Sequence, residues 1–82
     1  MDRLTLKPLN DQVCQVLDAR DGWVGNLKLI NGVWKFKAIG FDAQGNVLPG
    51  GGPLTARHNA LFTQLDEAEV SARLLAPLVT PA

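Results

Sequence analysis

Chemically reactive side chains are scarce in this sequence. It has one cysteine, Cys14, one histidine, His58, and no tyrosine. A lone cysteine cannot form a disulfide within the chain, and one cysteine with one histidine cannot supply the four ligands of a structural zinc site. Acid–base chemistry by an imidazole would have to use His58. We therefore expect a protein that is not an enzyme and that holds no metal and no other cofactor.

Long apolar runs and an excess of one charge are also missing. No stretch approaches the roughly 20 apolar residues of a membrane span, and no signal-peptide run follows the start of the chain. Eight basic and eight acidic side chains give a formal net charge of zero. A neutral chain has no general attraction to nucleic acid or to anionic lipid. We expect a cytoplasmic protein without a membrane partner, and nucleic acid is not the favoured ligand.

The length of 82 residues is enough for one domain only. An apolar fraction of 46% and a charged fraction of 20% are typical of a folded chain. Pro77 ends the last helical pattern. We expect a single α+β domain over residues 1–76 and a frayed tail over 77–82.

The centre of the chain predicts an antiparallel β-meander from about Trp23 to Leu48. Asn31-Gly32 between two apolar runs is typical of a two-residue hairpin turn, because both turn positions need a positive φ. This turn sets the register of the first two strands. The expected pairs are Ile30 with Val33, Leu29 with Trp34, Lys28 with Lys35, Leu27 with Phe36, and Asn26 with Lys37.

Side chains alternate between the two faces of a sheet, so the register also sorts them. The face expected to form the core collects Trp23, Leu27, Leu29, Trp34, Phe36 and Ala38. The opposite face, called the outer face below, is expected to collect Val24, Asn26, Lys28, Ile30, Val33, Lys35, Lys37, Ile39, Phe41 and Leu48.

A second turn, at residues 42–45, fits a type I turn that ends in a left-handed glycine, Gly45. It predicts a short third strand over residues 46–48, with Val47 opposite Gly40 on the core side. Pro49 then stops the pairing, since proline has no N–H to donate.

Helices are expected on both sides of the meander. Asn10 is a good N-cap for a helix over about residues 11–19, although a strand over 12–17 also fits that short apolar run. Thr55 is the expected cap of a second helix, and Asp66 caps a third helix over about Glu67–Leu75. Residues 3–7 alternate like a short edge strand. The predicted fold is a three-stranded meander, with that optional fourth strand, packed against one N-terminal and two C-terminal helices.

The outer face gives the leading functional hypothesis. Three short helices cannot obviously cover both faces of the sheet, and exposed apolar patches usually mark an interface. We expect a small accessory or interaction protein that forms a homodimer or docks a protein partner. The interface candidates are Val24, Ile39, Phe41 and Leu48.

The alternative hypothesis is a weak nucleic-acid or anion-binding module. Its basic side chains lie on the outer face, and a glycine-rich turn before a helix exposes backbone N–H groups that can hold an anion. The candidates are Lys28, Lys35, Lys37, Gly51, Gly52, Thr55, Arg57 and His58.

The hairpin Gly32-Val33-Trp34-Lys35-Phe36-Lys37 leads into Asp42-Ala43-Gln44-Gly45-Asn46. In topology this resembles the sheet-reading DNA-binding domains of certain plant transcription factors and of phage integrase arms, over less than half of the chain. Such domains read bases with arginines on the sheet. This chain has no arginine between Asp21 and Leu54, so the resemblance is not taken as membership of either family.

Overall fold

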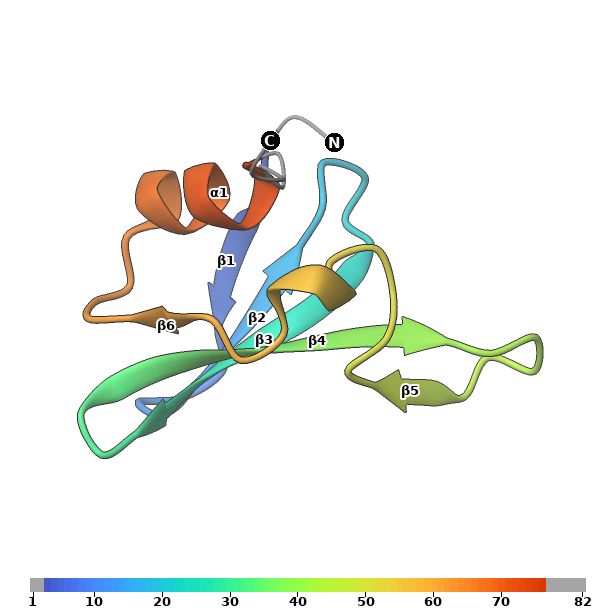
Figure 1. The fold of residues 1–82 in the computed structure, drawn as a ribbon, viewed down its shortest axis with the longest axis horizontal. Coiled ribbons are helices and arrows are strands. Elements are labelled where there is room, and N and C mark those ends of the chain that lie inside the picture. The colour runs from blue at the N-terminus through green and yellow to red at the C-terminus, as the bar shows by residue number, and fades with distance from the viewer. Residues whose placement is uncertain (1–2, 77–82) are drawn as a thin grey trace, which may run out of the picture.

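The computed structural model describes residues 3–76 and shows a curved antiparallel sheet with one helix packed on it (Figure 1). Five strands follow one another in chain order: β1 (Thr5–Pro8), β2 (Val13–Leu17), β3 (Trp23–Ile30), β4 (Val33–Phe41) and β5 (Val47–Pro49). A further short strand, β6 (Leu61–Phe62), also pairs with β4. The helical elements are one 3₁₀ turn, η1 (Thr55–Arg57), and one α-helix, α1 (Glu67–Leu75).

The predicted fold class is therefore wrong. Residues 3–76 form a sheet of six strands with one α-helix, instead of a three-stranded meander with three helices. The third expected helix is confirmed as α1, with Asp66 as its N-cap accepting a hydrogen bond from the Glu69 N–H. The expected edge strand is present as β1. The expected frayed tail at 77–82 lies outside the described residues.

The expected N-terminal helix is replaced by β2. Asn10 does bind backbone N–H groups two and three residues further on, those of Gln12 and Val13, as an N-cap would. Here these bonds close the tight turn between β1 and β2. Val13 and Val16 are β-branched, and β2 lies between β1 and β3, so pairing on both sides favours the strand.

The expected second helix stops after the single turn η1. Its continuation is prevented because β4 uses the next residues as edge partners: the Phe36 N–H donates to the Ala60 carbonyl and the Asn59 N–H donates to the Phe36 carbonyl. Asn59 adopts a φ of 75°, which no helix allows. Backbone pairing with β4, which is distant in the sequence, thus overrides the local helical pattern.

The first hairpin is confirmed in full. Asn31 and Gly32 have φ values of 52° and 79°, as a type I′ turn needs. Every predicted pair between β3 and β4 is present, from Ile30–Val33 to Asn26–Lys37.

The expected register of β5 is wrong by one residue. Val47 pairs with Phe41, and Leu48 pairs with Gly40. The reason is that the Asp42 N–H donates to the Asn46 carbonyl, so three residues rather than four form the loop. A slip of one residue exchanges the two faces. Val47 thus joins the outer face in place of Leu48.

The loops after β2 and β4 have the same hydrogen-bond pattern and the same backbone conformation. In each, an aspartate, Asp18 or Asp42, accepts hydrogen bonds from the N–H groups two and four residues further on. The third residue after each aspartate has a left-handed backbone, with φ of 62° at Asp21 and 84° at Gly45. These N–H donors lower the pKa of both carboxyl groups from the usual value of 3.8, most strongly the Gly22 donor at Asp18 and the Asn46 donor at Asp42.

A β-bulge corrects the expected faces at the start of β3. Val16 pairs with Gly25 while Leu17 pairs with Trp23, so Val24 is an extra residue on β3. Val24 consequently turns into the core, where only 2% of it is exposed. Trp23, expected in the core, lies on the outer face.

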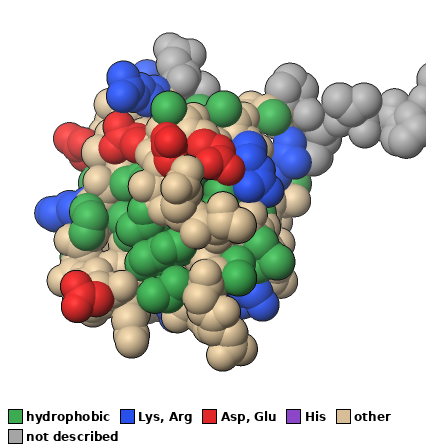
Figure 2. Space-filling view, turned by 90° about the vertical axis from the view of Figure 1, so that its left-hand side faces the viewer, with side chains coloured by type: hydrophobic (Ala, Val, Ile, Leu, Met, Phe, Trp, Pro, Cys, Tyr) green, Lys and Arg blue, Asp and Glu red, His purple; other side chains and the backbone are tan. Residues whose placement is uncertain are grey.

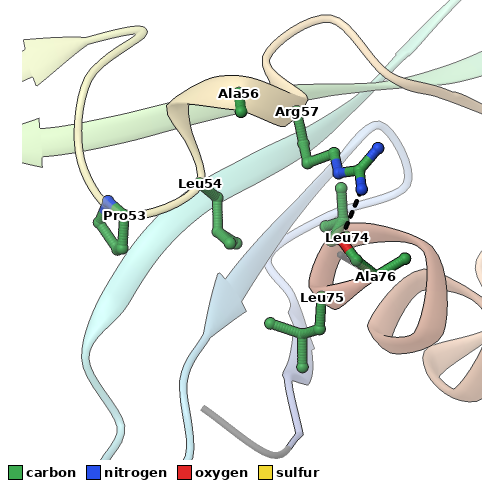
Figure 3. Close-up of a pocket in the computed structure, with 7 residues that line it drawn as sticks. All are labelled: Pro53, Leu54, Ala56, Arg57, Leu74, Leu75 and Ala76. Carbon is green, nitrogen blue, oxygen red and sulfur yellow. Dashed lines mark hydrogen bonds between the residues drawn. The ribbon is translucent and has the colours of Figure 1, made fainter. Parts of the chain in front are cut away.

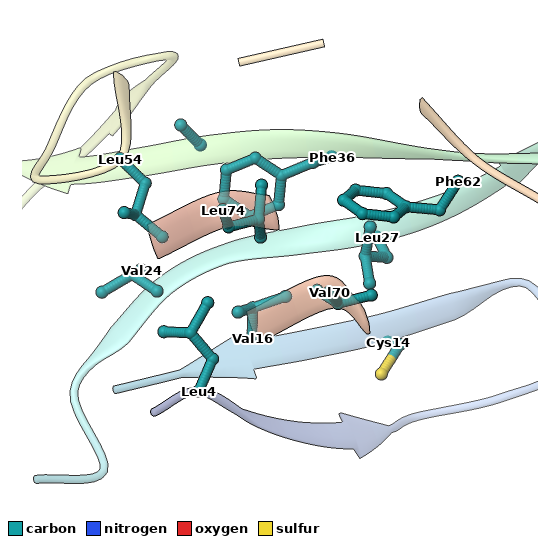
Figure 4. Close-up of a cluster of buried hydrophobic side chains, with 11 residues drawn as sticks. Leu4, Cys14, Val16, Val24, Leu27, Phe36, Leu54, Phe62, Val70 and Leu74 are labelled. Atoms are coloured by element: carbon teal, nitrogen blue, oxygen red, sulfur yellow. The ribbon is translucent and has the colours of Figure 1, made fainter. Parts of the chain in front are cut away.

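The core lies between the sheet and α1 (Figure 4). Each element except β1, β5 and η1 contributes at least one buried apolar side chain, and the residues just ahead of β1 and of η1, Leu4 and Leu54, add two more. The cluster consists of Leu4, Cys14, Val16, Val24, Leu27, Phe36, Ala38, Leu54, Phe62, Val70 and Leu74.

Helix α1 also covers the backbone of the edge strand. The Leu4 N–H donates to Ser71 Oγ (3.1 Å), and Ser71 Oγ donates to the Leu4 carbonyl (3.0 Å). One turn earlier, Glu67 accepts the Leu6 N–H (3.0 Å). Side chains of a helix thus satisfy backbone groups that would otherwise form an open sheet edge. The helix is too short to cross a membrane, and residues 3–76 contain no other α-helix.

Candidate functional site

The outer face is the side of the sheet opposite α1. The buried side chains of α1 pack into the core on the other side, and no helix among residues 3–76 covers the outer face. Several large apolar side chains on it stay accessible: Phe41 is 49% exposed and Val47 is 44% exposed. A sheet with one open face usually carries polar side chains there. The apolar side chains here need an explanation.

Two rows of side chains cross the middle of this face. Directly paired residues place Lys7, Gln15, Asn26 and Lys37 in one row and Val13, Lys28, Lys35 and Leu61 in the next. Cβ atoms of such partners lie only about 5 Å apart. The predicted candidates Lys28, Lys35 and Lys37 are therefore close neighbours.

No acidic side chain balances these lysines from the sheet. Across residues 3–76, the six strands contain four lysines and no aspartate or glutamate. Acidic side chains gather at the level of α1, with hydrophobic side chains below them (Figure 2). There, Glu67 pairs with Arg3 and Glu69 with Arg73. The acids Glu67 and Glu69 of α1 thus pair with arginines and not with the lysines of the sheet.

An apolar group adjoins the lysines. The rings of Trp23 and Phe41 lie 6.3 Å apart, tilted by 55°. The indole N–H of Trp23 donates to the Gly25 carbonyl and to Asn26 Oδ1. Val47 pairs with Phe41 and adds a further exposed side chain. The outer face therefore combines positive charge with an accessible aromatic surface.

Comparisons of the chain with protein-family models, with curated proteins and with solved structures found no match. The argument for function therefore rests on the outer face itself.

The four interface candidates do not lie together on one side of the sheet. Phe41 lies exposed on the outer face as expected. Ile39 lies on this face but is only 5% exposed. Val24 is in the core because of the bulge, and Leu48 points to the other side because of the shift of β5. The accessible apolar group at the β5 end of this face is thus Trp23, Phe41 and Val47, while Ile30 and Leu61 are 43% and 51% exposed nearer the first hairpin.

Some of the anion candidates meet in one pocket beside β4. This pocket has a volume of about 340 Å³ and combines side chains of the outer face with the loop after β5. Its lining residues are Asn26, Lys28, Lys37, Ala38, Ile39, Pro49, Gly50 and His58. Lys35 lies outside this lining.

The expected helical position of His58 is wrong, because η1 ends before it. Instead, its Nδ1 accepts a hydrogen bond from the Ala38 N–H at 3.0 Å. The imidazole thus takes the place of a strand partner along β4.

The glycine-rich loop packs against β4 instead of opening a helix. A Cβ on Gly52 would lie 2.0 Å from the Ile39 carbonyl oxygen, so the chain passes too close for a side chain. The Gly51 N–H donates to the Leu48 carbonyl, and the Thr55 N–H donates to the Gly52 carbonyl. Thr55 Oγ1 donates to the Gly50 carbonyl. Anion binding by Gly51, Gly52 and Thr55 remains a prediction, without the helix on which it depended.

Arg57 lies on the α1 side of the sheet, away from the lysines. Its Nη2 donates to the Ala76 carbonyl at 2.5 Å, which ties η1 to the end of α1 (Figure 3). The two segments border a cavity of about 290 Å³, lined by Pro53, Leu54, Ala56, Arg57, Leu74, Leu75 and Ala76. The apolar lining and the carbonyl contact give Arg57 a structural role here.

Cys14 is fully buried in the core, as expected for a small apolar side chain. Burial raises the pKa of its thiol above the usual value of 9.0, and a backbone hydrogen bond from Lys7 opposes this shift. The thiolate, which is the nucleophilic form, is therefore disfavoured.

Sequence reasoning missed two residues of this region. Trp23 was assigned to the core because nothing in the local pattern marks the bulge at Val24. Asn59, whose Oδ1 accepts from Lys37 Nζ at 2.7 Å, was assigned to a helix. Asn26 was correctly placed opposite Lys37, and the register alone could have identified it as a site residue.

Proposed function

We propose that the chain is a non-enzymatic docking module whose outer face binds a protein segment bearing acidic and apolar side chains. One observation carries this proposal: four lysines, with no acidic side chain on any strand of residues 3–76, share the outer face with the ring pair of Trp23 and Phe41. Acidic side chains of a partner would complement the lysines, and apolar ones would cover the aromatic rings. Interfaces are typically enriched in aromatic residues such as these.

Charge favours a different molecule over a second copy of this chain. A symmetric dimer through the outer face would place the same lysines on both sides of the interface. Lys28 and Lys35 already oppose each other within one sheet, which is unfavourable without a counter-charge. A partner with acidic side chains removes this repulsion, whereas a second copy doubles it.

The test uses defined peptides. A peptide of alternating Glu and Leu is expected to bind, and a peptide of alternating Lys and Leu is not. NMR shift changes should centre on the strand amides around Phe41 and Lys37. Phe41→Asp should weaken binding at least 10-fold, because it removes an exposed aromatic ring and adds the wrong charge.

The matched control is Leu48→Asp. Leu48 is 45% exposed and points to the side of the sheet opposite the outer face, so this variant should bind as well as the original chain. Equal losses in both variants, or equal binding of the two peptides, would refute the proposal. Light scattering that shows a dimer abolished by Phe41→Asp would replace it with self-association. Ile39→Asp is unsuitable because Ile39 is nearly fully buried.

Nucleic-acid binding is the second candidate function. It gains support from the outward position of Trp23, since an aromatic ring beside lysines can stack on a base. A single-stranded oligonucleotide should then bind with an affinity that falls steeply with salt. Replacing both Lys35 and Lys37 by Glu should abolish that binding. An oligonucleotide that shows no shift changes at low salt would dismiss this candidate.

A further inference from the structure

The pocket beside β4 has an unusual arrangement of polar groups. Four of its side chains carry nitrogen donors, two from lysines, one from an amide and one from an imidazole, and they are Asn26, Lys28, Lys37 and His58. Lysines can only donate hydrogen bonds, whereas an amide and a neutral imidazole can donate and accept. What the pocket can bind therefore depends on whether the donor or the acceptor atoms of Asn26 and His58 already have partners within the chain.

Both acceptor atoms are used within the chain. Asn26 Oδ1 accepts from the indole N–H of Trp23 at 3.1 Å, so its NH₂ group is the half left for a ligand. His58 Nδ1 accepts from the Ala38 N–H at 3.0 Å, so the proton of the neutral ring sits on Nε2. Each of the four side chains consequently offers the pocket a donor, and the acceptor atoms of Asn26 and His58 already have partners within the chain.

Two of the donors, His58 and Lys37, are held in place by their neighbours. A Cβ placed on Gly50 would lie 3.5 Å from His58 Nε2, so the loop packs against the imidazole. Asn59 Oδ1 holds Lys37 Nζ at 2.7 Å. Prior positioning of this kind reduces the entropy that binding costs.

We infer that this pocket binds a phosphate group in its dianionic, monoester form. The two lysines contribute two positive charges, which match a dianion better than the single charge of a carboxylate or a phosphodiester. Phosphate oxygens can accept from all four donors at once. The inference rests on the proposed function only for the source of the phosphate, a phosphorylated side chain of the docked partner.

The experiment titrates the protein with small anions at pH 7.5 and follows amide shifts by NMR. Inorganic phosphate and phosphoserine are the dianionic probes; acetate and dimethyl phosphate are the monoanionic ones. The dianions should bind at millimolar concentration, with the largest shifts at Gly50, His58 and Ala38, and at least 10-fold more tightly than the monoanions. Equal binding of all four probes, or shifts spread evenly over the outer face, would overturn the inference.

Three variants separate the pocket from general electrostatics. Asn26→Asp keeps the acceptor for Trp23 but loses the NH₂ donor, and Lys37→Gln loses one charge; each should weaken phosphate binding at least 10-fold. Lys7→Gln removes the same charge from the same face, on β1 outside the pocket, and should change the affinity less than twofold. A loss with Lys7→Gln as large as with Lys37→Gln would overturn the inference. Lys37→Gln decides the outcome should Asn26→Asp not fold.

The docking proposal and the phosphate proposal would be refuted by different results. Phosphate bound in the pocket by a chain that ignores the Glu-Leu peptide would remove the docking function and keep the site. Peptide binding without any dianion preference would keep the docking face and remove the phosphate site.

Discussion

Ser71 offers a sharp test of how α1 is joined to the sheet. Its hydroxyl accepts from the Leu4 N–H and donates to the Leu4 carbonyl, and Leu4 is fully buried. Ser71→Ala would leave both backbone groups without a partner and out of reach of water. Each such group costs roughly 1–3 kcal/mol. The higher helix propensity of alanine offsets this loss of stability by about 0.5 kcal/mol.

We therefore expect Ser71→Ala to lower the free energy of unfolding by at least about 1.5 kcal/mol. In a domain of this size that corresponds to a fall in melting temperature of at least roughly 6 °C. Urea unfolding followed by tryptophan fluorescence measures the free energy, and hydrogen exchange reports the Leu4 amide directly. That amide should exchange faster in the variant than the amides of β1, which follows it.

The control is the reverse change at the neighbouring exposed position, Ala72→Ser, which should cost only about 0.5 kcal/mol through helix propensity. A loss below about 0.5 kcal/mol for Ser71→Ala, with an unchanged exchange rate at Leu4, would refute the reasoning. It would mean that the edge of β1 does not depend on the helix.

Further predictions concern the two aspartate loops. Asp21→Gly should raise the free energy of unfolding by about 0.5 kcal/mol, because relief of roughly 1 kcal/mol of left-handed strain exceeds the added freedom of the unfolded chain. Gly45→Ala should lower it by about 1 kcal/mol through the backbone alone, since a Cβ there meets no atom within 4 Å. Because the folded pKa values of Asp18 and Asp42 lie below their unfolded values, their stabilisation is present above about pH 4 and lost as the pH falls through the folded values. The double replacement by Asn should flatten the acid side of a melting-temperature profile, and an unchanged slope would contradict this.

Local chemistry explains which elements could be predicted from the sequence. The Asn31-Gly32 turn has a backbone that few other residue pairs accept, so it fixed the register of β3 and β4 without any tertiary information. The N-cap Asp66 and the helical sequence pattern that follows it in α1 were an equally local signal. Both signals depend on the residues involved and their immediate neighbours, and both proved correct.

The failures have a common physical cause in long-range pairing. Asn10 forms the same bonds in a turn as it would at a helix start, so the side chain alone cannot distinguish them. Whether residues 13–17 form a helix or a strand is decided by β1 and β3 on either side. The bulge at Val24 likewise arises from the pairing of β2 with β3. It exchanged Trp23 with Val24 and so changed the composition of the candidate site.

The hydrogen bonds at the sheet edges support the proposal that a partner docks on the outer face and not along an edge strand. Along β1, Ser71 and Glu67 occupy the groups that an added strand would need, and Pro8 has no N–H to give. Between β5 and β6 the backbone of β4 bonds to residues 59 and 60 and to the ring of His58. A partner that adds a strand would have to displace these bonds. Binding through side chains on the outer face displaces none of them.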